Sequence, residues 1–207
     1  LVPISNDLIR YAHVNAEALV RDQIIKELAQ VADYAFLYGE GGEFEPRGIA
    51  NTEGIQKVDK AGAPNYNLGL KMLNMLGKKN HSIDDTQWVM GWDTYFALQT
   101  EVNASGNYVN KAELDAGRFA GRPFIVTSKV KSDGSKEDLF LIKTNDITAI
   151  QGLSVSIESS REASIHTKDG MMSAFGQDYT IVKALVEHDF GINYGHSVVL
   201  AQVDLGK

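Results

Sequence analysis

The chain has 207 residues, of which 43% are apolar and 23% are charged, and it contains no cysteine. This length and balance suit one globular domain or two small ones, and they exclude disordered, collagenous and coiled-coil proteins. The lack of cysteine excludes disulfide bonds, thiol nucleophiles and thiolate metal sites. The longest apolar run covers residues 34–38, so we expect no transmembrane helix in this sequence.

The net charge is −7, because 27 acidic side chains outnumber 20 basic ones. An acidic chain repels the phosphate backbone of nucleic acids over most of its surface, and no short window is dominated by lysine and arginine. Sequence-specific nucleic-acid binding is therefore not expected. The first residue is Leu1, and the basic start and apolar stretch of a signal peptide are both missing. We expect the natural chain to extend further upstream.

The first forty residues contain the strongest periodic signal. Residues 2–11 open with Pro3 and contain a polar cluster, which predicts a strand end, a turn and one helical turn. Two apolar stripes then predict a helix over about residues 15–38, with Asn15 as its N-cap and Gly39 closing it in the left-handed conformation. The stripes contain Val20, Ile24, Leu28, Val31 and Ala35, and Ile25, Ala29, Ala32 and Phe36. Their combined width indicates that the helix lies across a sheet.

Residues 39–49 are rich in glycine and glutamate and include a proline, which predicts an exposed acidic turn region. This segment does not match a phosphate-binding loop, because such a loop follows a strand and opens a helix. Here the segment follows a helix and lacks the Lys-Ser/Thr pair. Its carboxylates at Glu40, Glu43 and Glu45 would also repel phosphate.

The middle of the chain predicts a mixture of short elements. Strands are expected at residues 55–58, 87–90, 124–127, 139–143 and 147–150, and helices at residues 68–77 and 94–102. Asp93 is the expected N-cap of the second of these helices. Trp88 and Trp92 flank the turn before that helix, and we expect both side chains in the core.

From residue 153 the pattern changes to strands alone. Apolar and polar residues alternate over residues 153–158, and two further strands are expected at residues 179–188 and 197–203. A glycine-bearing loop, residues 189–195, joins these two strands. The order of elements predicts an α+β fold in which the ends of the chain form one layer and the middle forms another.

Histidines offer one hypothesis of a metal site. No two of the five lie at the spacing of ligands on a helix; they are His13, His81, His166, His188 and His196. His188, Asp189 and His196 could meet across the loop that joins the last two strands. That group is the best candidate site if the protein is a metal-dependent enzyme, whereas polar residues at a hairpin end are usually there for solvation.

No other pattern supports chemistry. The carboxylate pairs Asp84–Asp85 and Glu137–Asp138 are interpreted as solvated turns, and the nucleophile elbow Gly-x-Ser-x-Gly is absent. We therefore expect a protein that is not an enzyme, with no catalytic, cofactor-binding or metal-binding residues and no cofactor.

Five segments carry a resemblance to a known family. Residues 2–11 lead into the long helix, which ends in Ala35-Phe-Leu-Tyr-Gly-Glu-Gly-Gly and is followed by Pro46-Arg-Gly-Ile. Gly121-Arg-Pro-Phe-Ile-Val and residues 179–200 complete the set. In this order the segments resemble the tailed-bacteriophage major capsid protein family, whose fold encapsulins also use. The resemblance covers nearly the whole chain.

The resemblance implies a phage major capsid fold with two domains. A peripheral domain, residues 1–62 and 154–207, would hold a long spine helix at about residues 15–38, packed on a β-sheet. A mixed α/β axial domain, residues 63–153, would surround the symmetry axis of the capsomer. The N-terminal arm and extended loop of the family would lie upstream of Val2. Covalent cross-linking between subunits is not supported, because the segment that carries the family's cross-linking lysine is absent.

The resemblance also implies a function. The chain would be a structural subunit of a phage or prophage icosahedral capsid, self-assembling into pentamers and hexamers that enclose the viral genome without sequence-specific DNA binding. Its other partners would be the scaffold, portal and maturation protease, with no membrane, and it would be assembled in the bacterial host cytoplasm and reside in the virion. Two alternatives stay open: an encapsulin-like bacterial nanocompartment shell protein and a metal-dependent enzyme.

Overall fold

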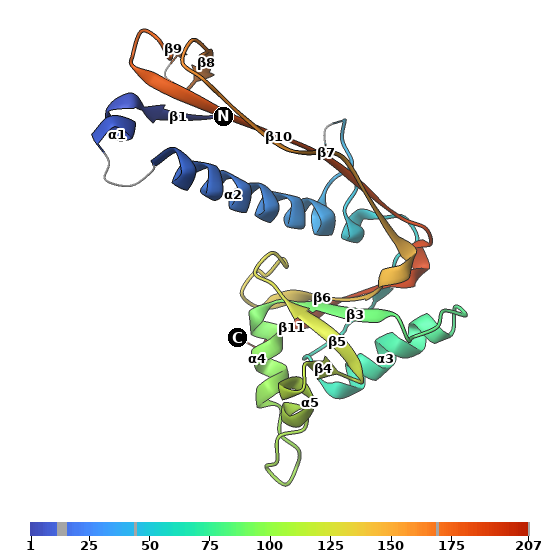
Figure 1. Ribbon diagram of the computed structural model, residues 1–207. Coiled ribbons are helices and arrows are strands. Elements are labelled where there is room, and N and C mark those ends of the chain that lie inside the picture. The colour runs from blue at the N-terminus through green and yellow to red at the C-terminus, as the bar shows by residue number, and fades with distance from the viewer. Residues whose placement is uncertain (12–15, 44, 169, 207) are drawn as a thin grey trace. The chain divides into compact units, whose positions relative to one another are not determined.

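The computed structural model describes residues 1–11, 16–43, 45–168 and 170–206. The chain divides into two compact units: a first unit of residues 1–32 and 150–189, and a second unit of residues 33–149 and 190–207. Three elements continue from one unit into the other, and they are α2 (Ala16–Tyr38), β7 (Ile147–Ser160) and β10 (Tyr179–Ile192) (Figure 1). Each unit is thus built from stretches that lie far apart in the sequence.

The first unit contains a three-stranded sheet in the order β1–β10–β7. Strand β1 (Val2–Ser5) runs antiparallel to β10, with Val2 opposite Val182, and the short helix α1 (Asn6–Tyr11) follows it. This matches the strand and helical turn predicted for residues 2–11. A hairpin of β8 (Ser164–Thr167) and β9 (Gly170–Ser173), which the sequence analysis did not predict, projects from the unit (Figure 1).

Helix α2 confirms the long helix predicted over residues 15–38, although Asn15 lies outside the described residues. Its apolar stripes are covered much less than expected. Leu19 and Val31 are each 64% exposed, and Leu28, at the centre of the predicted face, is half-buried. The described side chains of α2 become buried only toward its C-terminal end, from Ala35 onward.

We predicted that Gly39 closes α2 in the left-handed conformation, and this prediction is wrong. Glycine is needed at this position because another backbone segment packs closely against it. The N–H of Gly39 donates to the carbonyl of Ala35 at 2.8 Å, continuing the helical pattern, and the first glycine with positive φ is Gly41. A Cβ on Gly39 would lie 2.1 Å from the carbonyl oxygen of Pro46. The N–H of Gly48 donates to the carbonyl of Gly39 at 2.8 Å, so the returning chain lies directly against the helix end.

The second unit is built on a six-stranded sheet in the order β2–β11–β6–β3–β5–β4. The strands are β2 (Gln56–Val58), β11 (Val198–Asp204), β6 (Lys136–Lys143), β3 (Thr86–Met90), β5 (Arg122–Val126) and β4 (Arg118–Phe119). The long β11–β6 pair is antiparallel, with Val199 opposite Leu141. Strands β2 and β5 lie parallel to β11 and β3 respectively.

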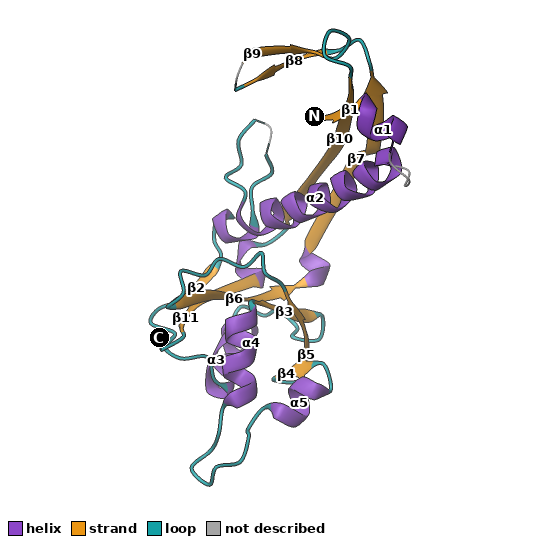
Figure 2. Ribbon diagram, turned by 90° about the vertical axis from the view of Figure 1, so that its left-hand side faces the viewer, coloured by secondary structure: helices purple, strands orange, loops and turns teal. Residues whose placement is uncertain are grey.

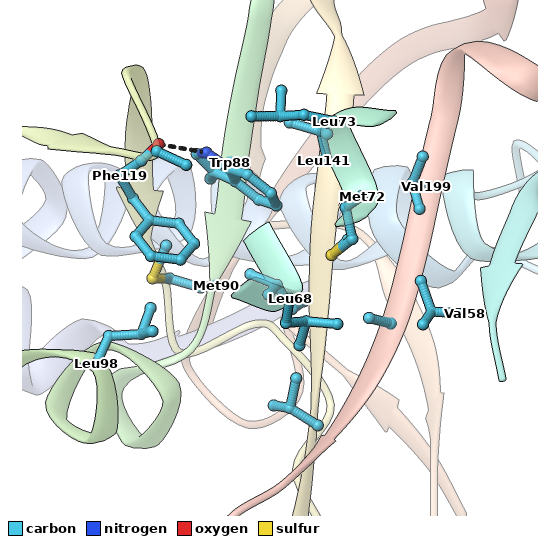
Figure 3. Close-up of a cluster of buried hydrophobic side chains, with 14 of the residues drawn as sticks. Val58, Leu68, Met72, Leu73, Trp88, Met90, Leu98, Phe119, Leu141 and Val199 are labelled. Atoms are coloured by element: carbon cyan, nitrogen blue, oxygen red, sulfur yellow. Dashed lines mark hydrogen bonds between the residues drawn. The ribbon is translucent and has the colours of Figure 1, made fainter. Parts of the chain in front are cut away.

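Helices cover one face of this sheet. They are α3 (Tyr66–Gly77), α4 (Trp92–Thr100) and α5 (Lys111–Asp115), and Figure 2 shows α3 and α4 on the same side. The buried core beneath them contains Leu68, Met72, Trp88, Met90 and Phe119 (Figure 3). The indole N–H of Trp88 donates to the carbonyl of Phe119 at 2.7 Å, so the one polar atom of this side chain is satisfied within the core.

A second cluster buries the opposite face of the sheet. It consists of Leu37, Tyr38, Ile49, Val130, Phe140, Ile142, Phe190 and Val198. The four consecutive residues Leu139 to Ile142 of β6 are therefore all buried, two on each face. A strand that is covered on both faces reads as a continuous apolar run, which explains why the sequence indicated it clearly.

The start of α4 corrects three predictions. Gly91 rather than Asp93 is the N-cap, and the carboxylate of Glu137 accepts the N–H of Thr94 at 2.8 Å. Glu137 is 4% exposed within β6, so the pair Glu137–Asp138 is not a solvated turn. Trp92 is 61% exposed and does not lie in the core. A Cβ on Gly91 would lie 2.1 Å from a Glu137 carboxylate oxygen, which explains the glycine.

The last strands are longer than predicted. The expected strand at residues 147–150 and the alternating segment from residue 153 are one element, β7. Strand β10 continues through most of the predicted loop to Ile192, and a short 3-10 helix (Gly195–Ser197) precedes β11. Two further 3-10 helices cover Ile49–Asn51 and Thr144–Asp146.

Candidate assembly surfaces

The histidine hypothesis finds no support in the geometry. His188 and Asp189 lie on β10 in the first unit, whereas His196 lies in the 3-10 helix of the second unit, beside His81 with ring centroids 4.8 Å apart. No three or more His, Cys, Asp or Glu side chains are arranged to hold a metal ion among the residues that the structure describes. His166 is exposed on β8, and His13 lies outside the described residues.

His81 belongs to a buried polar cluster within the second unit. Its Nδ1 lies 3.5 Å from a carboxylate oxygen of Asp146, and the ammonium of Lys143 lies 3.8 Å from the same oxygen. Burial lowers the pKa of His81, the neighbouring His196 lowers it further, and Asp146 opposes both effects. The cluster connects the segment after α3 to the 3-10 helix after β6, and we interpret its role as holding these two segments together.

A second polar network surrounds the end of α2. The Tyr38 hydroxyl donates to the Asp138 carboxylate at 2.9 Å and accepts the backbone N–H of Lys131 at 2.8 Å. The Lys131 ammonium lies 4.4 Å from the centroid of the Tyr38 ring. Burial raises the pKa of Tyr38 and also that of Asp138. These hydrogen bonds attach the C-terminal end of α2 to β6 and to the segment before it, all within the second unit.

Helix α4 carries an exposed aromatic face, which we define as Trp92 and Phe96. These side chains lie one turn apart and are 61% and 64% exposed. Tyr95, between them in the sequence, turns inward and packs against Phe124 with ring centroids 5.6 Å apart. The rings of Trp92 and Tyr95 pack edge to face with their centroids 6.1 Å apart, so Trp92 of the exposed aromatic face contacts the inward-facing Tyr95.

Helix α2 borders an apolar groove in the first unit, which we call the α2 groove. Its volume is about 410 Å³, and the exposed lining is almost wholly apolar. The lining residues are Val2, Leu19, Val20, Gln23, Ile24, Glu27, Leu28 and Val31. An apolar groove beside an exposed helix face is a candidate surface for contact with a partner.

The two surfaces differ in how far the sequence revealed them. The stripes of α2 were visible as helical periodicity, but periodicity cannot tell whether the chain itself or a partner covers a stripe. The α4 aromatic face was not predicted, because an aromatic residue next to a buried strand is usually assigned to the core. The signal available was that α4 carries apolar residues on more than one side, which is typical of a helix covered from two directions.

No helix in the described ranges is long and apolar enough to span a membrane.

The chain is similar to capsid proteins over almost its whole length. Residues 1–203 match the model of the phage capsid family. A curated relative, the major capsid protein of Klebsiella oxytoca phage phiKO2, is 27% identical over 215 aligned residues. That alignment covers 97% of this chain and 50% of the relative, so the chain spans half the length of the relative.

Solved structures show the same fold. The capsid of the native GTA particle has a TM-score of 0.77 at 12% identity, with 98% of this chain and 70% of the other covered. Mycobacterium phage Adephagia has a TM-score of 0.77 at 13% identity, with the same coverage. An encapsulin complex from Synechococcus elongatus has a TM-score of 0.62 at 13% identity, covering 100% of this chain and 73% of the other. The predicted α+β class and capsid fold are thereby confirmed.

Proposed function

This chain belongs to the phage capsid family, and from that premise we propose that it is a structural subunit of a phage or prophage icosahedral capsid. It self-assembles into pentamers and hexamers, and these enclose the viral genome. The observation that carries the proposal is exposed apolar surface on both units, at the α4 aromatic face and the α2 groove. Exposed apolar surface of this kind favours contact with a partner that covers it.

The domain assignment follows from the same proposal. Residues 63–153 form the axial domain around the capsomer axis, and residues 1–62 and 154–207 form the peripheral domain. The α4 aromatic face then belongs to the axial domain, where a neighbouring copy in the same capsomer covers it. The α2 groove belongs to the peripheral domain.

The energetics of a shell suit these surfaces. Tryptophan is among the residues enriched at interface hot spots, where truncation to alanine costs about 2 kcal/mol or more. In a closed symmetric assembly every copy repeats the same contacts, so modest contacts add to a stable particle. A subunit of this kind needs no catalytic site.

The remaining partners are part of the proposal. The particle is assembled in the host cytoplasm with a scaffold, a portal and a maturation protease, and it ends in the virion. Inside it, DNA is held without sequence-specific contacts, and the net charge of −7 supports this because an acidic chain does not adhere to packed DNA.

Electron microscopy and light scattering of the full natural chain test the proposal. We expect the wild type to form closed particles of uniform size, and Trp92→Ser/Phe96→Ser to stay as small oligomers with an unchanged melting temperature, because both side chains are exposed. Leu70→Ser, at a half-exposed position on α3, is the control and should assemble normally. A folded wild type that forms no particles would contradict the capsid function. Normal assembly of the double variant would contradict only the role of the aromatic face.

An encapsulin-like shell is the second candidate, supported by the similarity to the Synechococcus elongatus encapsulin complex over the whole chain. The contents of purified particles distinguish the two functions. Packaged DNA supports the capsid, and a co-purified protein cargo without DNA supports the nanocompartment.

A further inference from the structure

The second unit carries a groove lined by lysines, which we call the lysine groove. Its volume is about 440 Å³, and it is lined by Lys57, Val58, Asp59, Lys60, Lys136, Asp138, Leu200 and Gln202. Strands β2, β11 and β6 are neighbours in the sheet, with Lys57 beside Leu200 and Gln202 opposite Asp138. The groove therefore lies across three strands, and the partly exposed Leu200 contributes an apolar side chain to it.

The lysines of this groove take part in none of the described ion pairs, although the charge of Lys57 acts on the Asp138 carboxylate and that of Lys136 acts on Asp133. Lys57, Lys60 and Lys136 are exposed, and within the described part of the chain none of them forms an ion pair. Of the two carboxylates in the lining, Asp138 is half-buried and accepts a hydrogen bond from Tyr38. The lining holds three lysines and two aspartates, so the groove carries a net charge of +1 in a chain of net charge −7, and this local excess of positive charge favours a negatively charged partner.

The same chain carries a complementary segment. Glu40, Glu43 and Glu45 are exposed in the turn after α2, and we call these three residues the acidic loop. Arg47, the nearest basic residue, forms its ion pair with Glu53 at 3.1 Å. Among the described ion pairs, none joins the acidic loop to the lysine groove of the same chain. The backbone bond between Gly48 and Gly39 closes the base of the loop, and the three carboxylates are exposed beyond it.

We propose that the lysine groove of one subunit binds the acidic loop of a second copy of this chain. The inference rests on the proposed capsid function, because it needs many identical copies in one particle. A contact between two different surfaces of identical chains is heterologous, and such contacts generate rings when the rotation closes. Opposite charges on the two surfaces also set the register between neighbours and disfavour wrong pairings.

The composition of the groove favours a carboxylate-bearing loop over nucleic acid. A phosphate backbone is an extended run of negative charge, and binding it needs an equally extended run of cations. Here Asp59 and Asp138 interrupt the lysines, and the groove has room for only a few side chains. The partly exposed Leu200 provides an apolar surface on which the methylene groups of glutamate side chains pack.

Charge reversal and rescue in the full natural chain test this contact. Lys57→Glu/Lys136→Glu should raise the protein concentration needed for particle formation by roughly tenfold or more, because each lost pair is repeated around the shell. Adding Glu43→Lys/Glu45→Lys to the same chain should restore assembly, since the two charges are then exchanged. Lys78→Glu/Lys79→Glu, at exposed positions after α3, is the control with the same change in charge and should assemble like the wild type. The melting temperature of each variant, which we expect to be unchanged, checks folding.

The outcomes separate this inference from the capsid function. Particles from the wild type but not from the groove variant, with rescue by the exchange, support the contact. Normal assembly of the groove variant, or failure of the exchange to rescue, overturns it and leaves the capsid function standing. Normal assembly combined with weaker binding of duplex DNA assigns the lysines to nucleic acid instead. A wild type that never assembles contradicts the capsid function itself.

Discussion

Replacing Gly48 with alanine should destabilise the second unit, because there is no room for a methyl group at this position. The added Cβ would lie 2.3 Å from the backbone nitrogen of Gly39 and 2.5 Å from that of Tyr38. Ordinary carbon contacts need well over 3 Å, so one of the two backbone segments must move by about 1 Å. Gly48 has φ −63° and ψ 158°, a conformation open to any residue, so the cost is purely steric.

The magnitude follows from what such a shift breaks. Overpacking in a core costs about 1–3 kcal/mol. Moving the backbone also weakens the hydrogen bond from the Gly48 N–H to the Gly39 carbonyl. It further weakens the two hydrogen bonds, each 2.9 Å long, that the Asn51 side chain donates to the carbonyls of Tyr38 and Gly39. Each such bond contributes about 1 kcal/mol. We expect a total loss of about 2–4 kcal/mol, a large share of a typical free energy of unfolding of about 5–15 kcal/mol.

Urea unfolding followed by circular dichroism measures this loss. Gly42→Ala in the same loop is the matched control, because a Cβ there meets no atom within 4 Å and the residue does not have positive φ. Its free energy of unfolding should stay within about 0.5 kcal/mol of the wild type. Equal stability of the two alanine variants would refute the steric argument.

Two further predictions concern the second unit. Leu76→Ala should lower the free energy of unfolding by about 2–5 kcal/mol, because Leu76 is fully buried. Leu70 lies on the same helix and is 46% exposed, so Leu70→Ala should cost under about 1 kcal/mol in the same urea titration. Burial and the neighbouring His196 hold the pKa of His81 below its value of about 6.5 in the unfolded chain. Folding therefore disfavours the protonated imidazole, so His81 makes the protein less stable as the pH falls below about 6.5. His81→Gln should therefore reduce the loss of stability between pH 8 and pH 5.5, whereas the exposed His166→Gln should not, and equal pH dependence of the two variants would contradict this assignment.

Elements with a strong local pattern were predictable from the sequence. Helix α2 and helix α3 have helical periodicity, and β6 is a continuous apolar run, so each was found with bounds close to those observed. The missed strands and α-helix, which are α5, β4 and the β8–β9 hairpin, have two to five residues each and too few positions to show a period.

Errors arose where a distant residue decides the local structure. Asp93 is a good N-cap by type, but the N-terminus of α4 is bonded by Glu137, which lies 43 positions away in the sequence. Trp92 was assigned to the core by residue type, and its exposure depends on where α4 meets the sheet. The lysine groove combines residues of β2, β6 and β11, so no local motif could have indicated it.

The topology places an unusual demand on synthesis. Strand β1 pairs with β10, whose residue Val182 lies opposite Val2, and β11, near the end of the chain, inserts between β2 and β6. At a translation rate of roughly 5–20 residues per second, β1 waits for roughly 10–40 s before its partner has been made. Neither sheet can be completed on the ribosome until the last strands emerge. While β10 and β11 are still missing, their partner strands stay unpaired, so we expect the nascent chain to be most prone to aggregation in that interval.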